Sequence, residues 1–376
     1  MKKLKVALVI PTHFDIHSSL NNLLKVYRYL IRNKNLEVTI FTDKKNDDSY
    51  NGFKIEKING LDYKTILEKI LLVLGLPRFY YTDLIEKLRG YDAIETSNPE
   101  FYGFAYQSYI AAKRYNAKLV LRTSQTVDGF YLFKLTKFVI NPLARKAYDY
   151  SSSLLFTNPE VKERCIRLGF IDGRSKKAVI IGHATDTKTF IPLKTKKNSK
   201  KTILLSVGGL YRIKGHHLII KALKILSKNT KNLELWIVGE GYYRKRLESF
   251  AKKLKIEDKV NFLGKKGHEE LAKIYNMSDI FVLANYQEIT PAVNEAMACQ
   301  KPVVVMRCGG CEFVIPDKKH GLIAKRFNTE DLADKIDFLI HNKYKSRQIG
   351  KTGRLHIIKN FSIKNVAEKI YRSLVG

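Results

Sequence analysis

The segment Val207-Gly-Gly-Leu-Tyr-Arg-Ile-Lys-Gly215 separates a short run of β-branched and aliphatic residues, 202–207, from a longer amphipathic stretch, 216–228. A buried strand, a glycine-rich turn and a helix in this order are typical of a parallel α/β sheet. Paired glycines let the backbone approach an anion, and the next helix offers unpaired N–H groups. Lys214 adds a point charge and Arg212 a forked guanidinium. The segment is consistent with a phosphate-binding turn, although a tight turn needs glycine for steric reasons alone.

The same alternation of short apolar runs and amphipathic stretches recurs on both sides of this segment. In the first half the predicted strands are 5–10, 37–42, 93–95, 118–122, 153–157 and 178–182. In the second half they are 202–207, 233–238, 260–263, 280–284 and 302–306. Apolar strands that alternate with helices form parallel sheets covered on both faces, with ligands bound at the carboxyl ends of the strands. The sequence therefore predicts doubly wound α/β domains.

The length of the chain and one lysine-loaded stretch predict two domains. A chain of 376 residues exceeds what one hydrophobic core usually covers. We expect an N-terminal domain over 1–190, a linker over 191–201 and a second domain over 202–358. Residues 359–376 are predicted to form a helix that returns to the N-terminal domain.

Two further segments place polar groups after predicted strands. In Ala284-Asn-Tyr-Gln-Glu-Ile-Thr-Pro-Ala-Val-Asn-Glu-Ala-Met-Ala-Cys299 a strand end leads into a loop and then a helix that carries Glu295. A carboxylate there can accept hydrogen bonds from sugar hydroxyls, or it can simply be stabilised by the helix dipole. In Cys308-Gly-Gly-Cys-Glu-Phe313 the paired glycines offer backbone amides to a phosphate or hydroxyl, or form only a turn.

The cysteines indicate neither a disulfide framework nor a metal site. Four cysteines are too few to cross-link a chain of this length, which fits a reducing compartment. Cys308 and Cys311 form a CxxC pair, but no second pair or nearby histidines complete a zinc site. We therefore expect two ordinary thiols and no bound metal.

The order and spacing of these segments resemble the family-4 retaining glycosyltransferases of GT-B architecture, also called glycosyl transferases group 1. The likeness runs from the first strand to the C-terminal helix. The family pattern V-G-R-L, three variable residues, K-G corresponds to 207–215, with Gly209 in place of Arg. The other matches are Ile237-Val-Gly-Glu-Gly241 to V-G-x-G, Val260-Asn-Phe-Leu-Gly264 to V-x-F-L-G, 294–304 to E-A-M-A-C-G-x-P-V-V with Gln300 in place of Gly, and 182–192 to N-G-V-D-x-x-x-F-x-P. The resemblance implies two Rossmann-like domains that face each other across a cleft.

The resemblance also implies roles for individual residues. Lys214 would contact the donor diphosphate, and Glu295 the nucleotide ribose. Either Arg212 substitutes for the missing family arginine, or diphosphate binding depends on Lys214 and backbone amides. The first glutamate of the family pair falls on Gln287 by a gapless count and on Glu288 if one residue is deleted; the chemistry favours Glu288. The predicted catalytic residues are Lys214, Glu288 and Arg212, and the predicted donor-binding residues are Gly208, Gly209, Lys214, Gln287, Glu288, Ile289, Thr290, Pro291 and Glu295.

On the acceptor side the sequence departs from the family pattern. Family members often carry a Gly-Gly after the first strand and a catalytic-site histidine after the fourth. Here Pro11-Thr-His-Phe-Asp-Ile-His17 and Arg122-Thr-Ser-Gln125 stand at those places. His13 is a candidate contact for donor or acceptor, although a lone loop histidine is more often solvated. Gln125 is the other acceptor-side candidate.

Composition adds an expectation about partners. The 68 Lys and Arg against 36 Asp and Glu give a net charge of +32, which attracts anions. This favours an anionic glycan or lipid-linked acceptor, although a background bias toward lysine would have the same signature. The apolar stretch 66–81 predicts either a domain-packing helix or a contact with a membrane interface. We expect a cytoplasmic protein, either free or peripheral on the inner membrane face.

The predicted activity is a retaining, metal-independent hexosyl transfer from a UDP- or GDP-linked sugar, with no further cofactor. Two alternatives stand beside it. One is a nucleotide-sugar 2-epimerase of the same architecture. The other is a basic nucleic-acid-binding protein, against which the dispersed charges and the lack of a reading motif argue.

Overall fold

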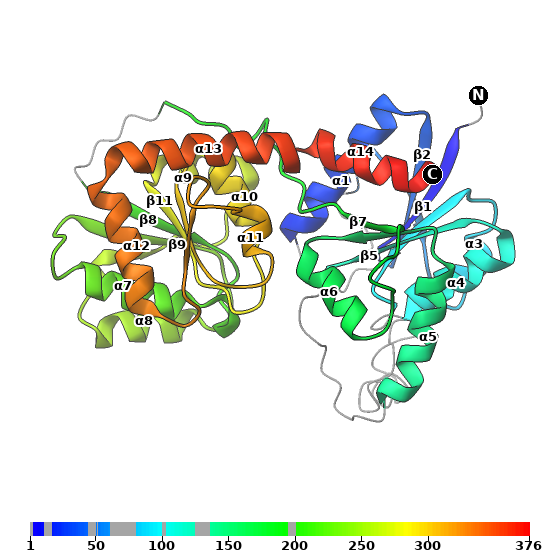
Figure 1. Ribbon diagram of the computed structural model, residues 1–376, viewed down its shortest axis with the longest axis horizontal. Helices are drawn as coiled ribbons and strands as arrows, with labels where there is room; N and C mark the ends of the chain where they lie inside the picture. The colour runs from blue at the N-terminus through cyan, green and yellow to red at the C-terminus, as the bar shows by residue number, and fades with distance from the viewer. Residues whose placement is uncertain are drawn as a thin grey trace. The chain divides into compact units, whose positions relative to one another are not determined.

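The computed structural model describes residues 3–10, 17–43, 50, 52–60, 80–99, 103–124, 136–194 and 201–376. The chain divides into two compact units (Figure 1). Unit 1 comprises Met1–Ala184 together with Ile363–Gly376, and unit 2 comprises Thr185–Ser362. Of the predicted linker, the described residues 191–194 and 201 fall within unit 2.

Unit 1 is built on a seven-stranded parallel sheet in the order β3-β2-β1-β4-β5-β6-β7. Its strands are β1 (Leu4–Val9), β2 (Leu36–Thr42), β3 (Lys54–Lys57), β4 (Ala93–Ser97), β5 (Lys118–Thr123), β6 (Ser153–Phe156) and β7 (Ala178–Ile180). Its helices are α1 (His17–Asn33), α3 (Leu84–Lys87), α4 (Gly103–Tyr115), α5 (Thr136–Tyr150), α6 (Pro159–Arg167) and α14 (Ile363–Val375). Side chains alternate between the faces of a strand, so Val6 and Leu8 enter one core while Ala7 and Val9 enter the other.

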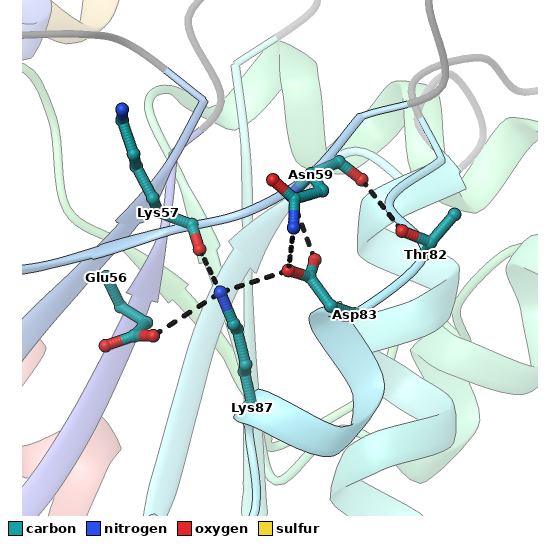
Figure 2. Close-up of polar contacts among 6 residues, drawn as sticks. All are labelled: Glu56, Lys57, Asn59, Thr82, Asp83 and Lys87. Atoms are coloured by element: carbon teal, nitrogen blue, oxygen red, sulfur yellow. Dashed lines mark hydrogen bonds and ion pairs between the residues drawn. The ribbon is translucent and has the colours of Figure 1, made fainter.

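A polar cluster joins the end of β3 to the start of α3 (Figure 2). The Asp83 carboxylate accepts hydrogen bonds from the backbone and side-chain nitrogens of Asn59 at 2.9 and 2.8 Å. Lys87 Nζ lies 3.0 Å from Asp83 Oδ2 and 3.4 Å from Glu56 Oε1, and it also donates to the Lys57 carbonyl. Because these groups are partly exposed to solvent, each ion pair contributes little to stability, about 0–1 kcal/mol. The cluster therefore mainly fixes the geometry of the turn.

Unit 2 is built on a six-stranded parallel sheet in the order β10-β9-β8-β11-β12-β13. Its strands are β8 (Thr202–Val207), β9 (Leu233–Val238), β10 (Val260–Phe262), β11 (Ile280–Leu283), β12 (Val303–Met306) and β13 (Leu322–Ala324). Its helices are η2 (Arg212–Lys214), α7 (His216–Leu226), α8 (Arg244–Lys253), η3 (Glu257–Lys259), α9 (His268–Met277), α10 (Pro291–Ala298), α11 (Cys311–Val314), α12 (Thr329–His341) and α13 (Lys343–Phe361). One core packs α7, α8 and α12 on the sheet, and a second core packs α9, α10 and α11 (Figure 1).

One departure from the family pattern has a backbone consequence in unit 2. Gln300 follows the end of α10 and adopts φ +61°, in the left-handed region that favours glycine. The family signature has glycine at this position. This chain forms the turn with glutamine, which has a conformational cost at this φ that glycine does not have. Gln300 is therefore held in this conformation by the surrounding structure.

The last helix, α14, completes the core of unit 1. Val366, Ala367, Ile370 and Leu374 are buried in the same core as α1, beside which α14 lies in Figure 1. The chain leaves and re-enters unit 1 at adjacent points, because the Thr185 N–H donates to the Phe361 carbonyl at 2.8 Å. Residues 185 and 362 also form an isolated parallel bridge.

The prediction of two doubly wound parallel α/β domains is confirmed. The arrangement of the domains across a cleft stays a prediction. None of the helices in the described part of the chain combines the length and apolar character needed to cross a bilayer.

Replacing Ile370 by alanine tests the place of α14 in unit 1. Ile370 is 0% exposed, so its truncation should leave a cavity and lower the free energy of unfolding by about 2–5 kcal/mol. Leu355→Ala on α13 is the matched control, because that side chain is 68% exposed. Urea unfolding followed by circular dichroism measures both variants. Equal, small effects of the two substitutions would contradict the packing described here.

Candidate functional site in unit 2

The glycine-rich segment 207–215 is locked at the carboxyl edge of the sheet by very close backbone contacts. Gly215 adopts φ +70°, and a Cβ at this position would lie 1.9 Å from the carbonyl oxygen of Ala284, just after β11. Gly239 after β9 adopts φ +143°, and a Cβ there would lie 2.0 Å from the Gly208 carbonyl oxygen. Only glycine fits at both positions. The segment is therefore held between the ends of β9 and β11.

Backbone hydrogen bonds connect the three glycine-containing motifs of this half. The Leu210 N–H donates to the Glu240 carbonyl at 2.9 Å, and the Gly239 N–H donates to the Gly264 carbonyl at 2.9 Å. Motifs separated by some 20–30 positions in the sequence thus form one continuous edge, where parallel α/β folds bind ligands.

Lys214 ends the short helix η2 and is partly buried. Burial lowers the pKa of its ammonium, while electrostatic interactions with Glu288 and Cys308 act in the opposite direction. Among the described residues, the Lys214 ammonium forms no ion pair or hydrogen bond. A desolvated cation without a bonded counter-ion attracts an anion strongly.

Arg212 lies in a different environment from Lys214. Its side chain is exposed, and its charge interacts with His217 and Tyr286. The Tyr286 hydroxyl is 2.6 Å from His217 Nε2, and the Tyr286 N–H donates to the Ile213 carbonyl at 3.0 Å. The Ile213–Tyr286 bond ties the glycine-rich segment to the loop that follows β11.

Tyr211 occupies the space beside Gly209, where the family pattern has arginine. A Cβ built on Gly209 would lie 2.5 Å from Tyr211 Cε2. The Tyr211 ring is 44% exposed and packs against Tyr242, with ring centroids 5.4 Å apart. A larger residue at 209 would therefore require this ring to move.

The loop 285–290 carries the predicted first acid of the site. The Ile289 N–H donates to the Gly309 carbonyl at 2.8 Å, and the Gly309 N–H donates to the Gln287 carbonyl at 2.9 Å. The Asn285 side chain donates to the Glu288 carbonyl at 2.7 Å. Backbone bonds on both sides of Glu288 thus fix the loop to the segment after β12.

Glu288 is the residue of this loop whose charge interacts with Lys214. Burial raises the pKa of the Glu288 carboxyl to about 7, although the Lys214 ammonium acts to lower it. Its buried Oε2 has no hydrogen-bond partner among the described residues. A carboxyl with this pKa changes charge near neutral pH, which is common at functional sites. Gln287, the alternative first acid, is partly exposed beside it.

Glu295 lies on α10 and is more buried than the sequence suggested. It is 2% exposed, and its Oε2 accepts a hydrogen bond from the Tyr275 hydroxyl at 3.0 Å. Burial and the Glu295 charge raise the pKa of Tyr275 well above its usual value, so the phenol stays protonated and donates. Tyr275 on α9 was not identified from the sequence, because nothing in its local pattern marks it as a partner of α10.

The other predicted residues contribute in different ways. The Ile289 side chain is buried in the core, so only the backbone of this residue is available to a ligand. Thr290 and Pro291 begin α10, and the buried Thr290 hydroxyl has no partner among the described residues. His13 and Gln125 lie outside the described residues.

His216 lies against the backbone of the glycine-rich segment and was also not identified from the sequence. It is buried at the start of α7, with Nδ1 3.2 Å from the Ser206 hydroxyl. Burial lowers the pKa of His216 to about 4, so the imidazole is neutral at physiological pH. The neutral ring therefore adds no positive charge beside Lys214.

Residues 187–356, nearly all of unit 2, match the model of the family described as glycosyl transferases group 1. Over this stretch the chain is similar to the group 1 glycosyltransferases. The candidate site lies entirely within the matched stretch.

Three proteins illustrate what the chain is similar to. It is 26% identical over 297 residues to the N,N'-diacetylbacillosaminyl-diphospho-undecaprenol alpha-1,3-N-acetylgalactosaminyltransferase of Campylobacter jejuni, covering 71% of this chain and 73% of the relative. It is 33% identical over 178 residues to a glycosyltransferase of Haemophilus influenzae, covering 47% and 49%. The Anabaena protein HepE, crystallised with UDP and glucose, has the same fold, with a TM-score of 0.78, 18% identity and 99% of both chains covered. The chain spans about half the length of several curated relatives that it matches.

The raised pKa of Glu288 predicts how stability depends on pH. A group whose pKa rises from 4.5 to about 7 on folding contributes stability that is fully present below pH 4.5 and lost as the pH rises through 7. Glu288→Gln removes the charge but keeps the shape. It should therefore match the wild type near pH 5 and be more stable at pH 8, by about 1–2 kcal/mol. Thermal unfolding at both pH values measures this, with Gln287→Glu as the control on the neighbouring position. An unchanged or lower midpoint for Glu288→Gln at pH 8 would show that the carboxyl is not desolvated.

Proposed function

We propose that the protein is a retaining glycosyltransferase that moves a hexosyl group from a UDP- or GDP-linked sugar to a hydroxyl of a glycan or lipid-linked acceptor. The proposal includes transfer without a bound metal ion or other cofactor. The observation that carries it is the partly buried Lys214 ammonium, which has no bonded counter-ion among the described residues and lies at a glycine-rich turn in the stretch that matches the group 1 glycosyltransferases.

The diphosphate of the donor fits the environment of Lys214. When the bond between the sugar and the diphosphate breaks, negative charge develops on the leaving phosphate oxygen. A fixed cation in a partly desolvated site stabilises that charge most at the transition state, where it is largest. The backbone amide of Gly209 and the side chain of Arg212 are further candidates for binding the diphosphate. The Gly208 N–H instead donates to the Val238 carbonyl at 3.0 Å.

Glu288 is assigned to the transferred sugar. With a pKa of about 7, its carboxyl is neutral in a substantial fraction of molecules at physiological pH. A neutral carboxyl can donate a hydrogen bond to a sugar hydroxyl and does not repel the adjacent diphosphate. Diphosphate bound at Lys214 would offset the charge that now lowers the pKa of Glu288, which favours the neutral form further.

Retention follows from the identity of the proton acceptor in this proposal. The acceptor hydroxyl approaches the anomeric carbon from the face that the diphosphate leaves. The leaving phosphate oxygen takes the hydroxyl proton as the new glycosidic bond forms, so the configuration is kept. Lys214 serves both events because it stabilises the same phosphate.

Glu295 is assigned to the ribose, with its orientation set by Tyr275. The 3.0 Å bond from the Tyr275 hydroxyl orients the carboxylate, which has lone pairs to accept a further hydrogen bond from a ribose hydroxyl. Because the side chain is buried, this role requires the nucleotide to reach the start of α10.

The acceptor and the location are proposed from charge and from relatives. The C. jejuni relative is named for a diphospho-undecaprenol substrate, and HepE was crystallised with UDP and glucose. A net charge of +32 suits an anionic acceptor and a peripheral position at the inner membrane face. The membrane-contact candidate 66–81 lies outside the described residues except for 80 and 81.

A donor screen followed by product analysis tests the proposed function. At least one UDP- or GDP-hexose should raise the unfolding midpoint, because a ligand that binds only the native state stabilises it. With that donor and a lipid-linked acceptor in EDTA, the product should keep the anomeric configuration of the donor, as read by NMR. Inverted product, or transfer restored only by added Mg²⁺ or Mn²⁺, would contradict the mechanism. Nucleotide released without an acceptor would favour the epimerase.

Replacing Lys214 by alanine tests the residue that carries the proposal. Because the ammonium is assigned to the leaving diphosphate, Lys214→Ala should lower kcat/KM by a factor of about 10²–10³ or more. Lys245→Ala, on the exposed face of α8, is the control and should retain activity. Initial rates with saturating acceptor measure both. Near-normal turnover by a folded Lys214→Ala protein would discredit the assignment.

A further inference from the structure

The CxxC pair after β12 brings two thiols into contact beside the candidate site. Cys308 Sγ and Cys311 Sγ are 3.1 Å apart. The Cys308 N–H points to Cys311 Sγ at 3.2 Å, and the Cys311 N–H donates to the Cys308 carbonyl at 3.3 Å. This closed four-residue turn can accommodate an S–S bond with little backbone movement.

The two thiols differ in their access to solvent. Cys308 is partly exposed, whereas Cys311 is 1% exposed. The other two cysteines, Cys165 and Cys299, are both buried in separate cores, and burial raises the pKa of Cys299 to about 12. An external reagent therefore reaches Cys308 first, and Cys311 is positioned to react second.

The CxxC turn is hydrogen-bonded to the loop that carries Glu288. Gly309, between the two cysteines, exchanges backbone hydrogen bonds of 2.9 and 2.8 Å with Gln287 and Ile289. Cys308 also interacts electrostatically with Lys214. A covalent change at Cys308 therefore alters both the surroundings of Lys214 and the anchor of the Glu288 loop.

We propose that Cys308 and Cys311 form a thiol modification site, which a low-molecular-weight disulfide converts into an intramolecular disulfide that weakens binding of the nucleotide sugar. The first part stands on the geometry of the pair alone. The effect on the nucleotide sugar rests on the proposed function.

The reaction is two consecutive thiol–disulfide exchanges. The Cys308 thiolate attacks one sulfur of the external disulfide, forms a mixed disulfide and releases one thiolate. Cys311 then loses its proton and attacks the Cys308 sulfur, which releases the second thiolate. Two electrons pass from the cysteines to the external disulfide, and the products are one protein disulfide and two small thiols. The positive charge of Lys214 stabilises the Cys308 thiolate in the first step.

Donor binding and oxidation oppose each other in this arrangement. Because the Glu288 loop is bonded to Gly309, closing the S–S bond from the present 3.1 Å separation of the sulfurs fixes this turn and restricts how the loop adjusts to a bound donor. By linkage, if the donor disfavours the disulfide, the disulfide disfavours the donor by the same factor. Coupling of this kind between neighbouring sites is commonly at least about fivefold.

Intact-mass analysis of the folded protein after incubation with oxidised glutathione tests the modification. The wild type should lose two hydrogen atoms, with the disulfide mapped to Cys308 and Cys311. Cys311→Ser should stop at a single glutathionyl adduct on Cys308, while Cys308→Ser should stay unmodified because its remaining thiols are buried. A wild type that keeps four thiols, or single variants that react equally, would overturn the proposal.

Calorimetric titration with the UDP- or GDP-hexose found in the donor screen tests the coupling. The dissociation constant should rise at least about fivefold on oxidation of the wild type and recover with dithiothreitol. Treated and untreated Cys308→Ser should bind with the same affinity. Equal affinities of oxidised and reduced wild type would overturn the coupling. If the disulfide forms but no nucleotide sugar binds either form, the proposed function fails and the modification site stands.

Discussion

The contact between the backbone of Gly215 and the carbonyl of Ala284 is the constraint on which the candidate site depends. No side chain fits there, since a Cβ would lie 1.9 Å from the carbonyl oxygen. The close approach lets the Ile213 carbonyl accept the Tyr286 N–H and brings Lys214 to the loop after β11. From that loop, backbone bonds at Gly309 continue to the segment after β12. Three neighbouring strand ends thus share one hydrogen-bonded edge.

This edge contains two largely buried ionisable groups, Lys214 and Glu288, whose burial lowers the stability of the fold. Burial acts on Lys214 and Glu288 in opposite directions, lowering the pKa of the amine and raising that of the acid. The two groups interact but form no ion pair. Each therefore destabilises the fold relative to a neutral residue, as is typical of sites selected for function. An anionic ligand offsets the free-energy cost of burying the Lys214 ammonium. Ligand binding is therefore coupled to the stability of unit 2.

The strands and the motif order were predictable from the sequence for a definite reason. Parallel strands covered on both faces are short apolar runs, and the turns that approach one another need glycine, so both leave clear local patterns. The contacts between different elements that refine the site leave no such local pattern in the sequence. Tyr275 and Glu295 come from different helices, and the burial of Glu295 depends on how α10 packs. The ring of Tyr211 beside Gly209 and the neutral His216 likewise arise from tertiary packing. The roles assigned to the site residues stay predictions.

The division of the chain also has a consequence for biosynthesis. Residues of unit 2 form an uninterrupted stretch, whereas unit 1 combines residues from both ends of the described chain. During translation, α14 is made after all of unit 2, so the part of the unit 1 core that α14 completes beside α1 remains uncovered until then. Nascent unit 1 therefore exposes apolar surface until the final helix docks, and in this interval it is a natural substrate for chaperones.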